Sequence, residues 1–289
     1  MINHSKKILD LVRQEFVYGG HVLSLGAVSI VVTAARILVL PIEWKFLVMA
    51  YLLVYMVYLY DRYVEIKKDL SIKTERATHF RRYYAKWTPM IICAGILIIA
   101  LICFIEKIKI IVAILGFLML ISGLFYGSYL KKITRKIPGF KNLFVPLIWA
   151  LLIILMPLFY SSPLSWGVWL FSLFVYLRIF IGVSFSDIKD IDSDKVEGIK
   201  TLVVIFGQKK FLRILAIVNI LPIIILMGGA LKGILPFFSL ILIAMSLYSY
   251  FYLWIINKRS TNVISLTGNL VYAENVWWAP LILLAQGIS

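Results

Sequence analysis

Acidic side chains are scarce in this sequence, and so are cysteine and histidine. Asp and Glu account for 14 of the 289 residues, against 30 Lys and Arg. The two cysteines, Cys93 and Cys103, lie in one apolar run, where a helix would point them about 80° apart. That geometry excludes a disulfide between them, so we interpret both as small buried residues. The three histidines show no metal-site spacing, and no pattern of a cleavable signal peptide is visible.

Apolar residues, in contrast, make up 62% of the chain, and its mean hydropathy is +0.95. Soluble domains are about half apolar, so this composition indicates a membrane protein. Runs near the length of a membrane span recur from end to end, which predicts an all-α integral membrane protein. We expect one transmembrane domain over residues 1–289, with residues 1–16 as an amphipathic helix on the membrane surface. The nine predicted transmembrane helices cover residues 17–40, 43–61, 88–105, 108–128, 142–160, 164–185, 211–230, 234–256 and 268–287.

The net charge of +16 would suggest nucleic acid in a soluble protein, but here the basic residues lie in the loops. The N-terminus and the loops after the second, fourth, sixth and eighth segments hold 24 Lys and Arg, and the opposite loops hold four. By the positive-inside rule, this bias predicts a cytoplasmic N-terminus. The partner that these charges imply is the lipid bilayer, with no role for nucleic acid.

One acidic stretch follows directly on the hydrophobic run 170–185. In a continuing helix its carboxylates Asp187, Asp190 and Asp194 stand at i, i+3 and i+7 and share one face, whereas Asp192 points about 140° away from Asp187. Clustered carboxylates repel one another unless a cation lies between them, and Mg²⁺ is the usual cation for such oxygen ligands. The following Gly198 and Thr201 predict the end of the helix and the turn into the next segment. A solvated, charged loop is the alternative for this stretch taken alone.

A second acidic stretch has a similar pattern and follows the hydrophobic run 46–60. Its carboxylates Asp61, Glu65 and Asp69 stand at i, i+4 and i+8, which also keeps them on one helical face. Both stretches lie on the side of the membrane that the charge bias assigns to the cytoplasm. Two acidic faces at the ends of membrane helices favour a pair of Mg²⁺-binding faces on that side.

Carboxylates that hold Mg²⁺ can bind a diphosphate through the metal, and nearby Lys and Arg neutralise the remaining charge. The candidate diphosphate-binding residues are Arg62, Lys67, Arg76, Lys132, Lys141 and Lys189. The reaction that suits this arrangement is the ionisation of an allylic diphosphate, because the metal stabilises the departing diphosphate. The lipid tail would lie among apolar helices, where the carbocation is shielded from water.

These residues resemble the UbiA superfamily of intramembrane prenyltransferases, which carries motifs of the forms NxxxDxxxD and DxxDxxxD on nine transmembrane helices. The second motif is matched by Asp187, Asp190 and Asp194, and the basic run 126–142 resembles the family's loop after the fourth helix. In the first motif Asp69 matches, whereas Asp61 stands in place of Asn and Glu65 in place of Asp. The resemblance implies the fold, a Mg²⁺ cofactor, these six acidic residues as catalytic metal ligands and an isoprenyl diphosphate donor.

The function that we expect is transfer of a prenyl group to an apolar acceptor, either aromatic or lipid. A membrane terpene cyclase of the same superfamily is the alternative enzyme, and a non-catalytic lipid-binding or transport protein is the alternative outside enzymes. Glu274 lies inside the ninth segment, and a carboxylate within the membrane is a functional candidate by default. A partner such as Arg36 or Arg178 would instead give Glu274 a structural role.

Overall fold

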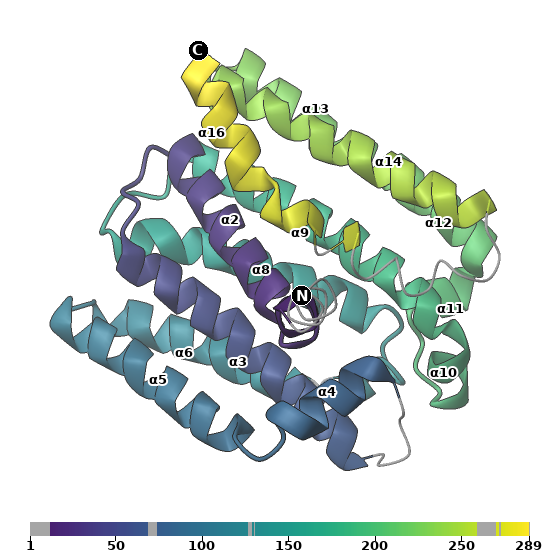
Figure 1. The fold of residues 1–289 in the computed structure, drawn as a ribbon. Coiled ribbons are helices and arrows are strands. Elements are labelled where there is room, and N and C mark those ends of the chain that lie inside the picture. Colours follow the sequence, from purple (N-terminus) through teal and green to yellow (C-terminus); the bar gives the residue numbers. More distant parts are fainter. Residues whose placement is uncertain are drawn as a thin grey trace, which may run out of the picture. The chain divides into compact units, whose positions relative to one another are not determined.

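The computed structural model describes residues 12–68, 74–126, 129, 131–258, 270–271 and 273–288, and within these ranges the regular structure is helical (Figure 1). The chain divides into two compact units. Unit 1 comprises Met1–Val28 and Glu43–Ser128, and unit 2 comprises Ser29–Ile42 and Tyr129–Ser289. The single domain over residues 1–289 stays a prediction. The predicted surface helix over residues 1–16 falls mostly outside the described residues, but Val12–Tyr18 is helical.

Unit 1 is built around the long helix α3. Small residues on the neighbouring helices allow close packing, as is common between membrane helices. A Cβ atom added at Gly95 of α5 would lie 2.5 Å from the Met56 sulfur of α3, and one at Gly123 of α6 would lie 2.5 Å from the Val57 Cγ2. The helices of this unit are the first part of α2 (His21–Ile37), α3 (Trp44–Lys68), α4 (Glu75–Tyr83), α5 (Thr88–Ile105) and α6 (Ile110–Phe125).

The short helix α4 packs on the C-terminal end of α3. The Thr74 side chain caps α4 by accepting a hydrogen bond from the Ala77 amide at 3.2 Å. Its apolar face, with Ala77 and Phe80, is buried against Leu59 and Ile66 of α3. The polar face of α4 is thereby left toward the surface.

Unit 2 is organised around α9, which is buried along most of its length and packs closely on α8. Its further helices come from the remainder of the chain. They are α7 (Lys131–Ile133), α8 (Phe140–Phe159), α9 (Trp166–Ser186), η2 (Asp187–Asp190), α10 (Ile191–Val196), α11 (Leu202–Phe206), α12 (Gln208–Val218), α13 (Ile220–Leu231), η3 (Phe237–Leu242), α14 (Ile243–Lys258) and α16 (Trp278–Ile288), and the second part of α2 belongs here as well.

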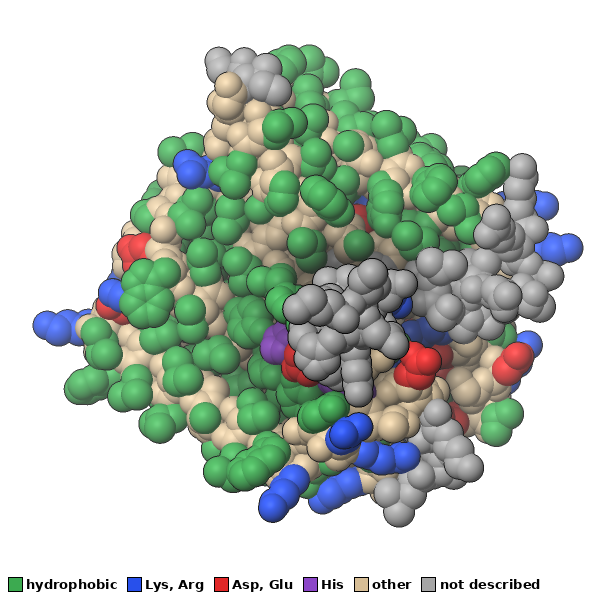
Figure 2. Space-filling view, viewed as in Figure 1, with side chains coloured by type: hydrophobic (Ala, Val, Ile, Leu, Met, Phe, Trp, Pro, Cys, Tyr) green, Lys and Arg blue, Asp and Glu red, His purple; other side chains and the backbone are tan. Residues whose placement is uncertain are grey.

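Six described helical stretches are long and apolar enough to cross a membrane, or seven if the bent pair Val12–Tyr18 and His21–Ile37 is one span. Three of the six run through two or more of the helices named above, as Trp166–Val196 does with α9, η2 and α10. The face in Figure 2 is covered largely by hydrophobic side chains, as expected for contact with lipid. The chain is an integral membrane protein. A helix lies in each of the nine predicted segments, but α6 has only 16 residues and residues 259–269 lie outside the described ones. The count of nine membrane-spanning helices therefore stays a prediction.

The expectation that both cysteines are buried is wrong. Cys93 is exposed and Cys103 is half-buried, and both are free thiols. The reason is the orientation of α5, which presents most of its circumference outward and buries only a narrow face, including Gly95, against α3. The apolar sequence predicts that this helix spans the membrane. It does not predict which side of the helix packs against the rest of the protein.

Candidate functional site

The acidic stretch after α9 stays helical but changes its type. The last residue of α9 is Ser186, a 3₁₀ turn covers Asp187–Asp190, and α10 continues to Val196. In a 3₁₀ turn the side chains at i and i+3 eclipse one another, so Asp187 and Asp190 share a face more closely than in an α-helix. Asp187 is 1% exposed and Asp194 3% exposed, whereas Asp192 is exposed. This difference in burial agrees with the prediction that Asp192 faces another side than Asp187.

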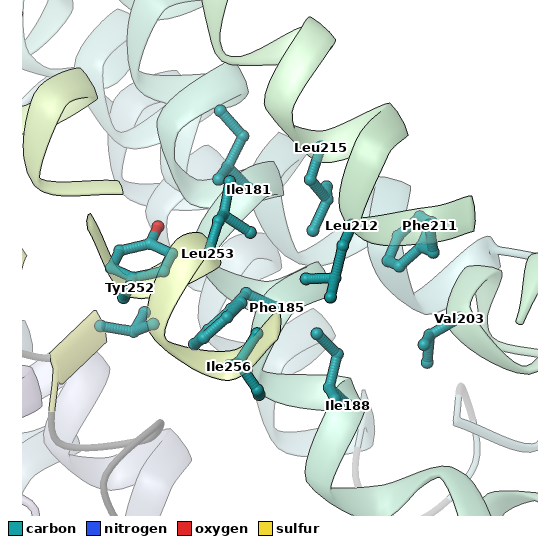
Figure 3. Close-up of a cluster of buried hydrophobic side chains, with 11 residues drawn as sticks. Ile181, Phe185, Ile188, Val203, Phe211, Leu212, Leu215, Tyr252, Leu253 and Ile256 are labelled. Atoms are coloured by element: carbon teal, nitrogen blue, oxygen red, sulfur yellow. The ribbon is translucent and has the colours of Figure 1, made fainter. Parts of the chain in front are cut away.

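The opposite face of the same segment is anchored in the apolar core of unit 2. Phe185 and Ile188 are buried against residues of α11, α12 and α14, among them Leu212 and Tyr252 (Figure 3). Apolar residues at i and i+3 thus alternate with the acidic positions along one helix end. This packing holds the carboxylates in place from behind.

The predicted helix end at Gly198 is confirmed. Gly198 has a φ of +69°, a left-handed conformation that glycine adopts without strain. Its amide donates to the Lys195 carbonyl at 3.1 Å, and the Ile199 amide donates to the Asp194 carbonyl at 2.8 Å, which together form a Schellman motif. The turn brings Thr201 back to the acidic segment, where its hydroxyl donates to the Asp194 carboxylate over a long 3.4 Å.

The first turn of α8 supplies the partners of Asp187. The Lys141 ammonium forms an ion pair with Asp187 Oδ1, and the Asn142 amide donates to Asp187 Oδ2 at 2.9 Å. The same amide group donates to the Ser184 hydroxyl at 3.1 Å, and the Asn142 carbonyl oxygen accepts from the Leu202 amide at 3.2 Å. Asn142 is fully buried, so it joins the starts of α8 and α11 to the end of α9. Sequence patterns alone assign no role to Asn142, although it directly follows a candidate basic residue.

Backbone hydrogen bonds dock the basic loop before α8 on the segment after the acidic stretch. The Gly139 amide donates to the Lys200 carbonyl at 2.9 Å, and the Lys200 amide donates to the Thr134 carbonyl at 3.2 Å. Gly139 has a φ of +71°, and an added Cβ would lie 2.6 Å from Leu202 Cδ2. The backbone conformation therefore favours glycine here, while the Leu202 side chain packs closely against it.

The first acidic stretch lies at the end of α3 in unit 1. The Arg62 guanidinium forms ion pairs with both neighbouring acids, at 2.7 Å to Asp61 and at a shorter distance to Glu65. Arg76 of α4 lies 3.9 Å from the other oxygen of Glu65. The side chains of Asp61 and Glu65 are 37% and 41% exposed, so both carboxylates are accessible. The third predicted ligand, Asp69, lies outside the described residues.

The remaining basic candidates make other contacts within the described part of the chain. Lys67 lies over the Tyr63 ring at 4.5 Å, and Lys132 lies over the Tyr129 ring at 5.9 Å. Both lysines are exposed and Lys189 is half-buried. None of the three forms an ion pair with a described residue. Of the six basic candidates, Lys141, Arg62 and Arg76 are the ones that the fold pairs with predicted metal ligands.

Two histidines that sequence patterns left without a role meet on one carboxylate. Glu15 accepts a hydrogen bond from the Tyr84 hydroxyl and lies 3.2 Å from His21 Nε2 and 3.0 Å from His79 Nε2. His21 also contacts the Tyr51 hydroxyl through Nδ1 at 2.5 Å. The cluster ties the helical stretch 12–18 to α2, α3 and α4. No spacing rule would have found it, because its members are drawn from separate helices.

Glu274 has a basic partner, as the structural interpretation of this residue required. It forms an ion pair with Arg178 of α9, whereas Arg36 is exposed. Arg178 also donates to the side chains of Asn219 and Ser249 at 2.6 Å each. Both charged side chains are almost fully buried, so the pair connects α9 to the C-terminal part of unit 2.

The donor set of unit 2 fits a hard divalent cation by its chemistry. Asp190 is half-buried, and its carboxylate makes no hydrogen bond or ion pair with a described residue. Asp194 lies one helical turn further on, while both oxygens of Asp187 are engaged by Lys141 and Asn142. Among the described residues, no three His, Cys, Asp or Glu side chains lie close enough together to hold a metal ion. A cation that binds here therefore takes a few protein oxygens and completes its shell with water or phosphate, as Mg²⁺ commonly does.

Comparisons with known proteins agree with this architecture. The chain is similar in fold to the apo structure of a UbiA homologue from Aeropyrum pernix K1, with a TM-score of 0.64 at 13% identity over 93% of this chain and 97% of the other. It is also similar to a structure of a digeranylgeranylglyceryl phosphate synthase in membranes, with a TM-score of 0.60 at 15% identity over 95% and 96% of the two chains. No curated protein sequence matches. Residues 22–271 match the model of the UbiA prenyltransferase family, and the chain therefore belongs to that family.

Proposed function

We propose that this chain transfers a prenyl group from an isoprenyl diphosphate to an apolar acceptor, either aromatic or lipid, in a reaction that depends on Mg²⁺. One observation carries the proposal: buried carboxylates and a lysine ammonium are held together at the end of an apolar helix. Asp187 and Lys141 are paired there, and Asp190 follows on the same face with an accessible carboxylate. The family and the two similar folds support prenyl transfer inside the membrane.

In this proposal the acidic residues bind the cation and the basic residues bind the phosphate oxygens. Asp190 and Asp194 would hold the cation in unit 2, with Asp187 as the third carboxylate, and Asp61, Glu65 and Asp69 would hold cation in unit 1. When bound, Mg²⁺ neutralises the diphosphate and stabilises it as a leaving group. Lys141 lies beside the acidic face and supplies positive charge for phosphate oxygens. We propose the same phosphate-binding role for Arg62, Lys67, Arg76, Lys132 and Lys189.

The bias of Lys and Arg in the loops supports a cytoplasmic location for the N-terminus and for both acidic stretches. On that side the protein would meet a water-soluble or amphiphilic diphosphate. The acceptor and the prenyl tail would come from the bilayer.

Acceptor dependence tests the reaction. Purified protein with Mg²⁺ and a panel of allylic diphosphates should release diphosphate slowly when the donor is alone. Addition of membrane lipid extract should raise the release and give a product heavier by one prenyl group, which mass spectrometry detects. The physical reason is that a cation in a dry site reacts with the electron pairs bound beside it.

Two outcomes would contradict the transferase proposal. Rapid release of diphosphate from the donor alone, with a cyclic hydrocarbon or terpene alcohol as product, would identify a cyclase with the same metal site. Binding of the donor with no turnover under any acceptor would indicate a lipid-binding or transport protein. Asp192→Asn is the matched control for the active chain, because Asp192 belongs to the same stretch but is exposed.

A further inference from the structure

A basic and aromatic surface lies where α4 turns into the membrane helix α5. It consists of Arg82, Tyr83, Lys86 and Trp87, and we name it the 82–87 corner. All four side chains are exposed, with Tyr83 at 44% and Trp87 at 50%. In Figure 2, viewed as in Figure 1, basic side chains gather along the lower edge over α4 and the turn into α5.

Backbone hydrogen bonds hold the turn of the corner. The Ala85 amide donates to the Phe80 carbonyl at 2.9 Å, and the Trp87 and Thr88 amides both donate to the Tyr84 carbonyl at 2.9 Å. Phe80 and Tyr84, which alternate with the exposed residues, are buried against α3. The buried side of the turn thus fixes the direction in which the four exposed side chains point.

No acid in the described part of the chain neutralises the charges of the corner. Neither Arg82 nor Lys86 forms an ion pair with a described residue. Their cations instead lie over aromatic rings, Arg82 at 5.3 Å from the centre of Tyr83 and Lys86 at 5.5 Å from the centre of Trp87. Within the described part of the chain, the corner therefore presents two unpaired positive charges at the surface.

The position of α5 indicates that lipid headgroups surround the corner. An apolar stripe of this helix faces outward, with Met90 62%, Leu97 60% and Phe104 82% exposed. Its 18 residues span about 27 Å, close to the thickness of the hydrocarbon core. Since the stripe begins with Met90, the residues just before Thr88 lie at the depth of the lipid headgroups. Aromatic and basic side chains at this depth contact phosphate and glycerol groups.

We propose that the 82–87 corner is a contact site for the headgroups of anionic phospholipids, in which Arg82 and Lys86 bind the lipid phosphate and Trp87 lies beside the glycerol region. Membrane-surface attraction of a basic residue corresponds to about a fivefold preference for anionic lipid per residue. Two such residues give roughly a 25-fold preference at low ionic strength, which salt reduces.

Local fluorescence quenching tests the proposal. The full-length protein is reconstituted in bilayers that contain equal fractions of a phosphatidylglycerol and a phosphatidylcholine, one of which is brominated. The contribution of Trp87 is the difference between the native chain and Trp87→Phe, since the chain has 8 tryptophans. Brominated phosphatidylglycerol should quench this contribution several-fold more than brominated phosphatidylcholine. Arg82→Gln combined with Lys86→Gln should make the two lipids equal.

A matched control comes from the other end of the same helix. Lys107→Gln combined with Lys109→Gln removes the same charge from exposed positions there, and it should leave the lipid preference at Trp87 unchanged. Equal quenching by both lipids in the native chain would overturn the proposal, and so would loss of the preference in this control. Removal of the preference by millimolar inorganic phosphate would show a free-anion site instead of a lipid contact. Protection of Trp87 from both brominated lipids would show that protein covers the corner, which also overturns the proposal.

Discussion

The buried pair Arg178 and Glu274 predicts that loss of one charge destabilises unit 2 much more than loss of a hydrogen bond. The perturbation is Glu274→Gln, which keeps the size of the side chain and an amide oxygen but removes the negative charge. Arg178 then stays charged at 0% side-chain exposure, with the neutral groups of Asn219 and Ser249 as its neighbours.

Two magnitudes decide the size of the effect. A hydrogen bond between membrane helices contributes on average only about 0.6 kcal/mol. A buried charge that has lost its partner costs about 3–5 kcal/mol. Because the substitution keeps a polar partner but strands the charge, the second value governs, and we expect the free energy of unfolding to fall by about 3 kcal/mol. Total stabilities are of the order of 5–15 kcal/mol, so this loss is a large share.

A double-mutant cycle separates the charge from the packing. Arg178→Met alone should also destabilise, because it leaves Glu274 buried without its cation. The two substitutions together remove both charges, so their combined loss should be smaller than the sum of the single losses by about 1–3 kcal/mol. Arg36→Met is the control, since Arg36 is exposed and its loss should change stability by no more than about 0.5 kcal/mol.

The assay is unfolding of the purified protein in detergent micelles, followed by circular dichroism, with prenyl transfer measured below the transition. The expected result is a lower midpoint with activity retained at low temperature. Unchanged stability of Glu274→Gln together with abolished activity would refute the reasoning and assign Glu274 to the chemistry.

Three further predictions follow from the site. Asp190→Asn should abolish turnover and weaken the binding of Mn²⁺ measured by electron paramagnetic resonance, whereas Asp192→Asn should leave both near the native values; equal effects would remove the acidic face from the site. Asn142→Ala should lower the free energy of unfolding by about 2–4 kcal/mol, because it leaves a buried carboxylate and a buried amide each short of one partner; a change below about 0.5 kcal/mol in chemical unfolding would show that the contacts are not stabilising. Cysteines introduced at Ser193 and Ser162 should react with an impermeant thiol reagent from opposite sides of the membrane, and reaction of both from one side would contradict the predicted orientation.

The features that sequence determined are those encoded within one helix. The apolar runs predicted the membrane helices, because a span must be long and apolar wherever it lies in the fold. The spacing of Asp187 and Asp190 predicted a common face, and the 3₁₀ turn, in which side chains at i and i+3 eclipse, preserves it for this pair. Gly198 predicted the helix end for the same local reason, since only a residue that tolerates positive φ suits that position. The motif also led to the family that the match over residues 22–271 then confirmed.

The pairing of charges was decided by tertiary structure alone. Lys141 was one of six basic candidates, and packing of α8 against α9 brings it to Asp187 across 46 positions of the chain. Arg178 reaches Glu274 across 96 positions, while Arg36, which sequence could not distinguish from it, faces outward. Local periodicity gives the face on which a side chain lies but not the element that covers this face. That choice depends on how distant helices pack, because an ion pair forms only where two faces meet and water is excluded.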